Sequence, residues 1–98
     1  MRLVALFEDT PTTADVRARL QAQHLDYLRR NQAEIRLGGG LRESPEAESF
    51  VGGLWVLEVA SRERAVQLVE NDPYFLAEPR PYRLLVWGKP LRDIDVVL

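Results

Sequence analysis

The sequence contains no cysteine and a single histidine, His24. The lack of cysteine excludes disulfides, thiolate metal sites and cysteine nucleophiles. With one histidine, a zinc site would need carboxylates for all its other protein ligands, which is an unusual set. The sequence therefore predicts no metal site.

Long apolar runs and basic clusters are also missing. No apolar run approaches the roughly 18 residues that a membrane helix needs, and strand-like residues 3–7 leave no room for a signal peptide before them. The net charge of -2 provides no basic patch for a phosphate backbone. We expect a cytoplasmic protein that binds neither membrane nor nucleic acid.

The composition fits one soluble domain, with a core over residues 1–90 and a C-terminal tail over 91–98. Hydrophobic residues make up 46% of the 98 residues and charged residues 29%, as in ordinary globular proteins. At this size folding buries only roughly 60–65% of the unfolded chain's surface, so the domain gains stability from a partner.

Strand-like and helical segments follow one another in the order β-α-β-β-α-β. Residues 2–8 and 54–60 are apolar at almost every position, which is typical of strands buried on both faces. Residues 34–41 alternate, with Ile35 and Leu37 on one side, and a fourth strand is expected over 82–87. Helices are predicted over 13–32 and 61–70, with one further helical turn over 74–77.

This order predicts a ferredoxin-like α+β fold, in which a four-stranded antiparallel sheet carries both helices on one face. The first and third strands then lie in the centre, and these are the two that are apolar on both faces. The second and fourth strands form the edges. Trp55 and Trp87 are expected to be core aromatics.

Three glycines, Gly38 to Gly40, end the second strand, and residues 42–52 form a long connection to the third. The glycines allow either a bulge in the strand or the close approach of a ligand to the backbone. Connections of this length in compact domains are often lids or mobile segments.

His24 and Asp72 are the candidate pair for chemistry. His24 lies on the buried stripe of the first helix, four residues from Leu20 and from Leu28. Asp72 precedes Pro73, which pushes the backbone of Asp72 out of the helical region and ends the second helix. A histidine bonded to a buried aspartate is a workable general base, because the carboxylate fixes the tautomer and stabilises the imidazolium. The alternative is structural: His24 bonds a backbone carbonyl and Asp72 caps a helix end.

Several short motifs, in this order and spacing, resemble the YCII-related (YciI-like) family. The motifs cover nearly the whole chain: His24-Leu25-Asp26-Tyr27-Leu28, Gly39-Gly40, Gly52-Gly53, Asp72-Pro73-Tyr74 and Lys89-Pro90-Leu91. The resemblance implies a dimeric α+β barrel related to muconolactone isomerase-like proteins, with a His–Asp active site carried over to His24 and Asp72. It also implies a relationship to a dehydrochlorinase that acts on a chlorinated hydroxyquinol.

Two stretches depart from the family pattern. Family members often carry an arginine three residues before the helix histidine, and this chain has Gln21 there. If that arginine binds an anion in relatives, this chain is expected to prefer a neutral substrate. Residues 75–81 are also bulkier and richer in proline, which predicts a different pocket wall.

The sequence thus predicts a small isomerase or dehydrochlorinase-like lyase that acts on a small organic substrate and uses no cofactor. His24 is the general base, Asp72 orients it, and Gly39 and Tyr74 line the substrate pocket. The alternative is a non-catalytic, small-ligand-binding or accessory domain that uses the same cleft.

A homodimer joined through the sheet is also predicted. Both helices cover one face, yet the central strands offer apolar side chains to the other face as well. Such a patch exceeds the few hundred Å² that monomers normally expose. The tail is predicted to reach across the dimer and complete the seal, with Ile94, Val96 and Leu98 as its apolar side.

Overall fold

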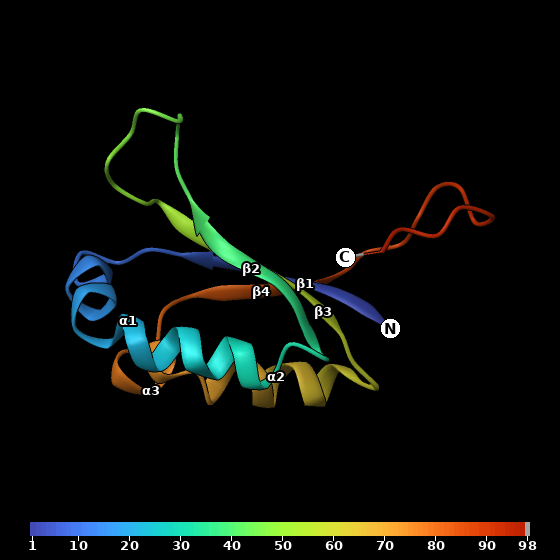
Figure 1. The fold of residues 1–98 in the computed structure, drawn as a ribbon, viewed down its shortest axis with the longest axis horizontal. Helices are drawn as coiled ribbons and strands as arrows, with labels where there is room; N and C mark the ends of the chain where they lie inside the picture. The colour runs from blue at the N-terminus through green and yellow to red at the C-terminus, as the bar shows by residue number, and fades with distance from the viewer. Residues whose placement is uncertain (98) are drawn as a thin grey trace.

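The computed structural model describes residues 1–97 as a four-stranded sheet with three helices (Figure 1). In chain order the elements are β1 (Arg2–Glu8), α1 (Thr13–Arg30), β2 (Ile35–Leu41), β3 (Gly52–Glu58), α2 (Arg62–Glu70), α3 (Pro73–Ala77) and β4 (Tyr82–Val86). The predicted order is confirmed, and the predicted helical turn over 74–77 is α3.

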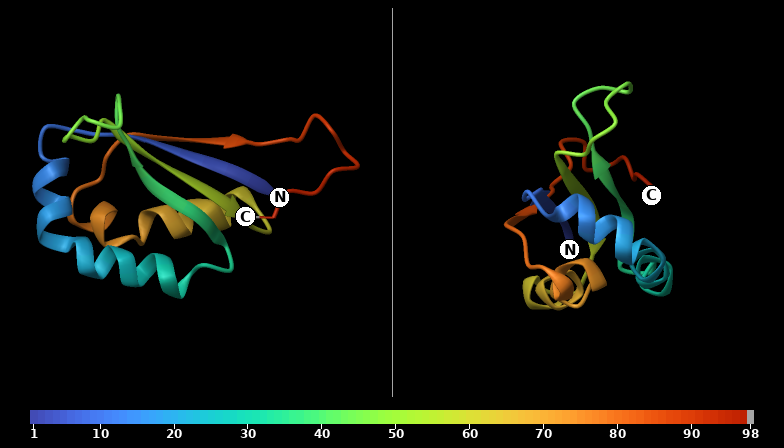
Figure 2. Two further views of the ribbon diagram at one scale, coloured as in Figure 1. Left: turned by 45° about the horizontal axis from the view of Figure 1, so that its top comes forward. Right: turned by 90° about the vertical axis from the view of Figure 1, so that its left-hand side faces the viewer.

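The sheet has the strand order β2-β3-β1-β4, with every neighbouring pair antiparallel. The central and edge strands are therefore those that the sequence predicts, and the fold is ferredoxin-like α+β. The helices lie together on one face of the sheet (Figure 2). None of the helices within residues 1–97 has the length and apolarity needed to cross a membrane.

The core lies between the sheet and the helices. One alternating set of β1, Leu3, Ala5 and Phe7, is buried there, and it is joined by Trp55 and Leu57 of β3. Since side chains alternate along a strand, this set shares the helix-facing side. Helix α2 adds Ala65, Leu68 and Val69. The Tyr27 hydroxyl of α1 donates a 2.7 Å hydrogen bond to the Leu68 carbonyl, which fixes α1 against α2.

A bulge at Arg36 changes which side chains of β2 face the helices. Ile35 pairs with Leu57, but Leu37 pairs with Val56, so two residues of β2 oppose one step of β3. Ile35 is buried, whereas Leu37 is 56% exposed on the opposite face. The prediction that both lie on one side is wrong because simple alternation assumes an unbroken strand.

Trp87 is not a core residue, which corrects a second expectation. Strand β4 ends at Val86, one residue earlier than predicted, and the side chain of Trp87 is 52% exposed. Trp55 is buried as predicted.

The sheet face that carries no helix is apolar. The partners Val4, Leu85 and Val56 share this face with Leu37, and Leu6 and Leu54 continue it. The left view of Figure 2 shows this face of the sheet without a covering helix. The predicted second apolar set of the central strands therefore lies outside the helix–sheet core.

We expect this face to join two copies of the chain, as the sequence predicts. At roughly 25 cal/mol per Å², burying even ~500 Å² per subunit contributes on the order of 10 kcal/mol before association costs. Light scattering at micromolar concentration should give a dimer. Leu37→Glu should weaken it, whereas Leu76→Glu, which changes an exposed leucine of α3, should not. A stable 11.2 kDa wild-type monomer would contradict this prediction.

The sealing role of the tail stays a prediction; Leu98 lies outside the described residues.

Gly52 is predicted to tolerate no side chain. A Cβ atom at Gly52 would lie 2.3 Å from the Phe7 carbonyl oxygen, whereas one at Gly39 would have no neighbour within 4 Å. Because the clash involves backbone of the adjacent strand, Gly52→Ala should lower the free energy of unfolding by about 1–3 kcal/mol or more. Gly39→Ala, also in a strand, serves as the control and should change it by less than about 0.5 kcal/mol. Equal midpoints in urea denaturation would contradict the prediction.

Candidate active site

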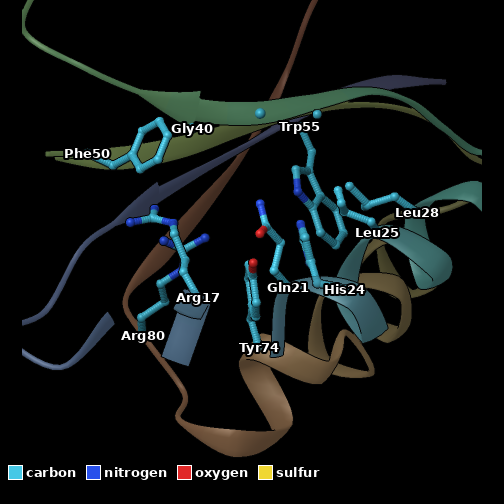
Figure 3. A pocket seen from close by; sticks show the side chains of 12 residues that line it. Arg17, Gln21, His24, Leu25, Leu28, Gly40, Phe50, Trp55, Tyr74 and Arg80 are labelled. Carbon is cyan, nitrogen blue, oxygen red and sulfur yellow. The ribbon is translucent and has the colours of Figure 1, made fainter. Parts of the chain in front are cut away.

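Helix α1 positions His24 between the sheet and the second half of the chain. Its side chain extends from α1 toward the sheet, beside Gln21 and Trp55 (Figure 3). The side chain is largely buried, with 13% exposed. Tyr27 lies three residues after His24, and its hydroxyl donates a hydrogen bond to α2. This bond fixes the part of α1 that carries His24.

The corner between α2 and α3 positions Asp72. Ser61 caps the start of helix α2, since its hydroxyl accepts a hydrogen bond from the Arg64 amide, and the helix ends at Glu70. Asp72 then has an extended backbone (φ -63°, ψ 134°) and Pro73 opens α3, where the absent proline N–H needs no partner. The Asp72 side chain is 5% exposed and makes no capping bond to α3.

The two residues meet in a 2.7 Å hydrogen bond between His24 Nδ1 and Asp72 Oδ1. The contact that the sequence predicts is therefore present, although 48 positions separate the two residues. His24 thus bonds a carboxylate and not the backbone carbonyl of the structural alternative, and Asp72 occupies the N-cap position of α3 without a side-chain capping bond. The catalytic role of the pair stays a prediction.

Tyr74 fixes the plane of the imidazole. The two rings are stacked, with centroids 3.9 Å apart and planes inclined by 7°. Burial raises the pKa of the Tyr74 phenol above its usual value, and the nearby Asp72 charge adds to the rise while Arg17 opposes it. Tyr74 therefore presents a neutral phenol beside His24 at neutral pH.

His24 and Tyr74 line a cavity of about 150 Å³ beneath the sheet (Figure 3). The walls come from α1, the end of β2, the connection before β3, β3 itself, α3 and the segment before β4. The lining residues are Arg17, Gln21, His24, Leu25, Leu28, Gly38, Gly39, Gly40, Phe50, Trp55, Tyr74 and Arg80. The predicted lining residues Gly39 and Tyr74 are both among them; Asp72 lies behind His24.

Gly38 and Gly40, on either side of Gly39, allow close packing at the roof of the cavity. A Cβ at Gly38 would lie 3.0 Å from the Trp55 ring, and one at Gly40 would lie 2.5 Å from the ring of Phe50. Phe50, in the connection 42–51, thus packs directly on the backbone of β2. This places one residue of the predicted lid segment in the cavity wall.

A cluster of three charged residues, Asp9, Arg17 and Arg80, forms one end of the site. Asp9 accepts hydrogen bonds from both guanidinium groups and is itself largely buried. Burial lowers the pKa of Arg80, and the neighbouring Arg17 charge lowers it further, while Asp9 counteracts both. An arginine remains charged under these conditions, since its ordinary pKa is very high.

Sequence reasoning did not identify Arg17, Phe50 or Arg80 as site residues. Arg17 could have been found, because it precedes Gln21 by four residues and His24 by seven and so shares their helix face. Phe50 and Arg80 carry no such signal, since each comes from an irregular segment whose path depends on the complete fold.

No cluster of three or more His, Cys, Asp or Glu side chains suited to a metal ion occurs within residues 1–97. The polar lining of the cavity consists of nitrogen donors, an imidazole, a phenol and an amide. Such a surface is suited to binding oxygen-bearing organic groups.

Comparison with known proteins agrees with the fold. A family model described as the YCII-related domain matches residues 1–87. The chain belongs to the YCII-related family.

One solved structure of similar fold is the 5-chloro-2-hydroxyhydroquinone dehydrochlorinase TftG from Burkholderia phenoliruptrix AC1100, in complex with 2,5-dihydroxybenzoquinone. The two chains are 26% identical, with a TM-score of 0.78, and the match covers 90% of this YCII-related chain and 94% of TftG. No curated protein sequence matches significantly.

Proposed function

We propose that this YCII-related protein is a small enzyme that transfers a proton on a small, ring-shaped organic substrate. The reaction is an isomerisation or an elimination of the dehydrochlorinase type, with His24 as general base and Asp72 orienting it. The 2.7 Å bond between His24 Nδ1 and a buried carboxylate, at the wall of a cavity, carries the proposal.

The hydrogen bond sets the protonation pattern of the base. A carboxylate can only accept, so the neutral imidazole holds its proton on Nδ1 and leaves the lone pair on Nε2 for the substrate. When Nε2 takes a proton, the adjacent carboxylate charge stabilises the imidazolium. Stacking on Tyr74 restricts rotation of the ring, which keeps Nε2 in one direction. Positioned proton transfer of this kind contributes typically ~10²–10⁴-fold to a rate.

The size and lining of the cavity favour a single six-membered ring. A volume of about 150 Å³ is similar to that of an engineered protein cavity that binds benzene. Leu25, Leu28 and Trp55 provide apolar walls for such a ring. The structural neighbour TftG, named for its action on a chlorinated hydroquinone, supports a substrate of this general shape.

In an elimination, His24 Nε2 takes a proton from a substrate hydroxyl and delivers it to the ring carbon that bears chlorine. The same nitrogen then takes the proton of a second hydroxyl, and the electron pair that this releases forms the quinone and expels chloride from that carbon. The net change is the loss of HCl. In an isomerisation, the same proton returns to a different atom of the substrate. Neither route draws on a cofactor, because the proton is held by the imidazole in between.

We expect His24→Ala to fold and to lose at least 10²-fold in turnover, because the general base is removed. Chloride release from 5-chloro-2-hydroxyhydroquinone is the first assay, followed by absorbance assays on enol and lactone substrates. Gln23→Ala, at an exposed neighbouring position, is the matched control and should keep full activity. Full activity in His24→Ala would end the assignment. Ligand binding without turnover in the wild type would favour the non-catalytic alternative.

We expect Asp72→Asn to keep the fold and to lose as much activity as His24→Ala, or less. The amide can still hydrogen-bond the ring, but it no longer stabilises the imidazolium or enforces the tautomer. Circular dichroism and activity per folded molecule check the two parts separately. An unfolded variant whose folded fraction is fully active would assign Asp72 a purely structural role.

A further inference from the structure

Two guanidinium groups share a single carboxylate at the end of the cavity away from His24. Asp9 Oδ2 accepts from Arg17 Nη1 at 2.6 Å, and Asp9 Oδ1 accepts from Arg17 Nη2 and from Arg80 Nη1, both at 2.8 Å. Two positive charges and one negative charge leave this cluster with a net charge of +1. Figure 3 shows Arg17 and Arg80 at one end of the cavity and His24 with Trp55 at the other.

The cluster is held in place without a ligand. The Arg80 guanidinium lies 4.6 Å from the centre of the Phe7 ring, and that of Arg17 lies 4.6 Å from the centre of Phe50. Arg17 also donates to the Gly52 carbonyl. Only 10% of the Arg80 side chain is exposed. Charges that are fixed in a site of low polarity interact strongly with a bound anion and need little rearrangement.

Arg80 retains free donors for such an anion. Within residues 1–97 it hydrogen-bonds Asp9 alone, through Nη1, although a guanidinium carries five N–H donors. Both Arg17 and Arg80 line the cavity, whereas Asp9 does not. The cavity surface at this end therefore offers positively charged donors, with the carboxylate placed behind them.

We propose that Arg17 and Arg80 form an anion subsite that binds a negatively charged oxygen group of the substrate, a carboxylate or an acidic phenol oxygen. This inference rests on the proposed function, because it places the substrate's ring between this subsite and His24. Arg80 and Arg17 then act as specificity-determining residues that orient the ring relative to Nε2. Planar guanidinium groups suit this task, since they bind carboxylates in a defined geometry.

The subsite reverses the expectation drawn from Gln21. That expectation was a neutral substrate, because Gln21 stands where relatives often carry an arginine. It assumed that the pocket has no other arginine to supply a positive charge. Arg17 lies four residues before Gln21, one helical turn away on the same face, and Arg80 approaches from the segment before β4. The pocket therefore contains two arginines, and its preference is inferred to be for an anion.

Benzoate and benzamide test the subsite, because they have nearly the same shape and differ in charge at pH 7. Calorimetric titration of the wild-type protein with each should give at least tenfold tighter binding of benzoate. Arg17→Gln and Arg80→Gln should each reduce this ratio at least threefold, and Arg80→Lys, which keeps the charge, should retain more of it than Arg80→Gln. Arg19→Gln is the matched control on α1, because Arg19 pairs with Asp15 on the exposed side, and should leave the ratio unchanged. Circular dichroism selects the folded variants.

The result is independent of catalysis, because neither probe needs to react. His24→Gln should keep the benzoate preference even where it abolishes turnover, so failure of the general-base assignment leaves this test standing. Equal binding of the two probes, absence of benzoate binding up to millimolar concentration, or a ratio that survives both arginine-to-glutamine changes would overturn the proposal. In that case Arg17, Asp9 and Arg80 form a structural ion cluster.

Discussion

A buried carboxylate requires a partner, and this requirement organises the region around Asp72. Leaving such a charge buried without compensation costs several kcal/mol, and in this fold His24 supplies the compensating hydrogen bond. Asp72 belongs to the corner between α2 and α3, and His24 belongs to α1. The pairing therefore restricts how α1 can lie against the rest of the helical layer, and the Tyr27 hydroxyl enforces the same arrangement one turn further along.

Two acidic residues position the polar side chains of the cavity without lining it themselves. Asp72 contacts His24 at one end and Asp9 contacts the two arginines at the other, yet neither carboxylate lines the cavity. Asp72 fixes the direction of the imidazole, and Asp9 fixes the direction of the two guanidinium groups. The nitrogen atoms of these side chains that do not bond a carboxylate remain available toward the interior of the cavity. A ligand would thus meet an imidazole and guanidinium groups, while the negative charge that positions them stays on the far side.

The fold was largely predictable because its signals are local. Apolar residues on both faces of residues 2–8 and 54–60 identified the central strands, and the Asp72–Pro73 pair identified the corner that ends α2. His24 was recognisable from its place on the buried stripe. The arginine cluster was not, because Arg80 reaches it from a segment without periodicity and the shared carboxylate of Asp9 becomes visible only when β1, α1 and that segment are packed. Leu37 and Trp87 were misplaced where a strand is irregular or ends early.

The extra residue at Arg36 changes which residues of β2 face the helices, and the existence of the cavity depends on this change. Before the bulge, odd-numbered Ile35 points to the helices; after it, even-numbered Gly38 and Gly40 do so. An unbroken strand would turn Leu37 and Leu41 inward, and their side chains would fill the space that the ring of a ligand needs. Deleting Arg36 would remove the extra residue and leave Ile35 and the glycines facing the helices. The bulge therefore lets the strand carry one residue more than the sheet needs and still keep the chamber open.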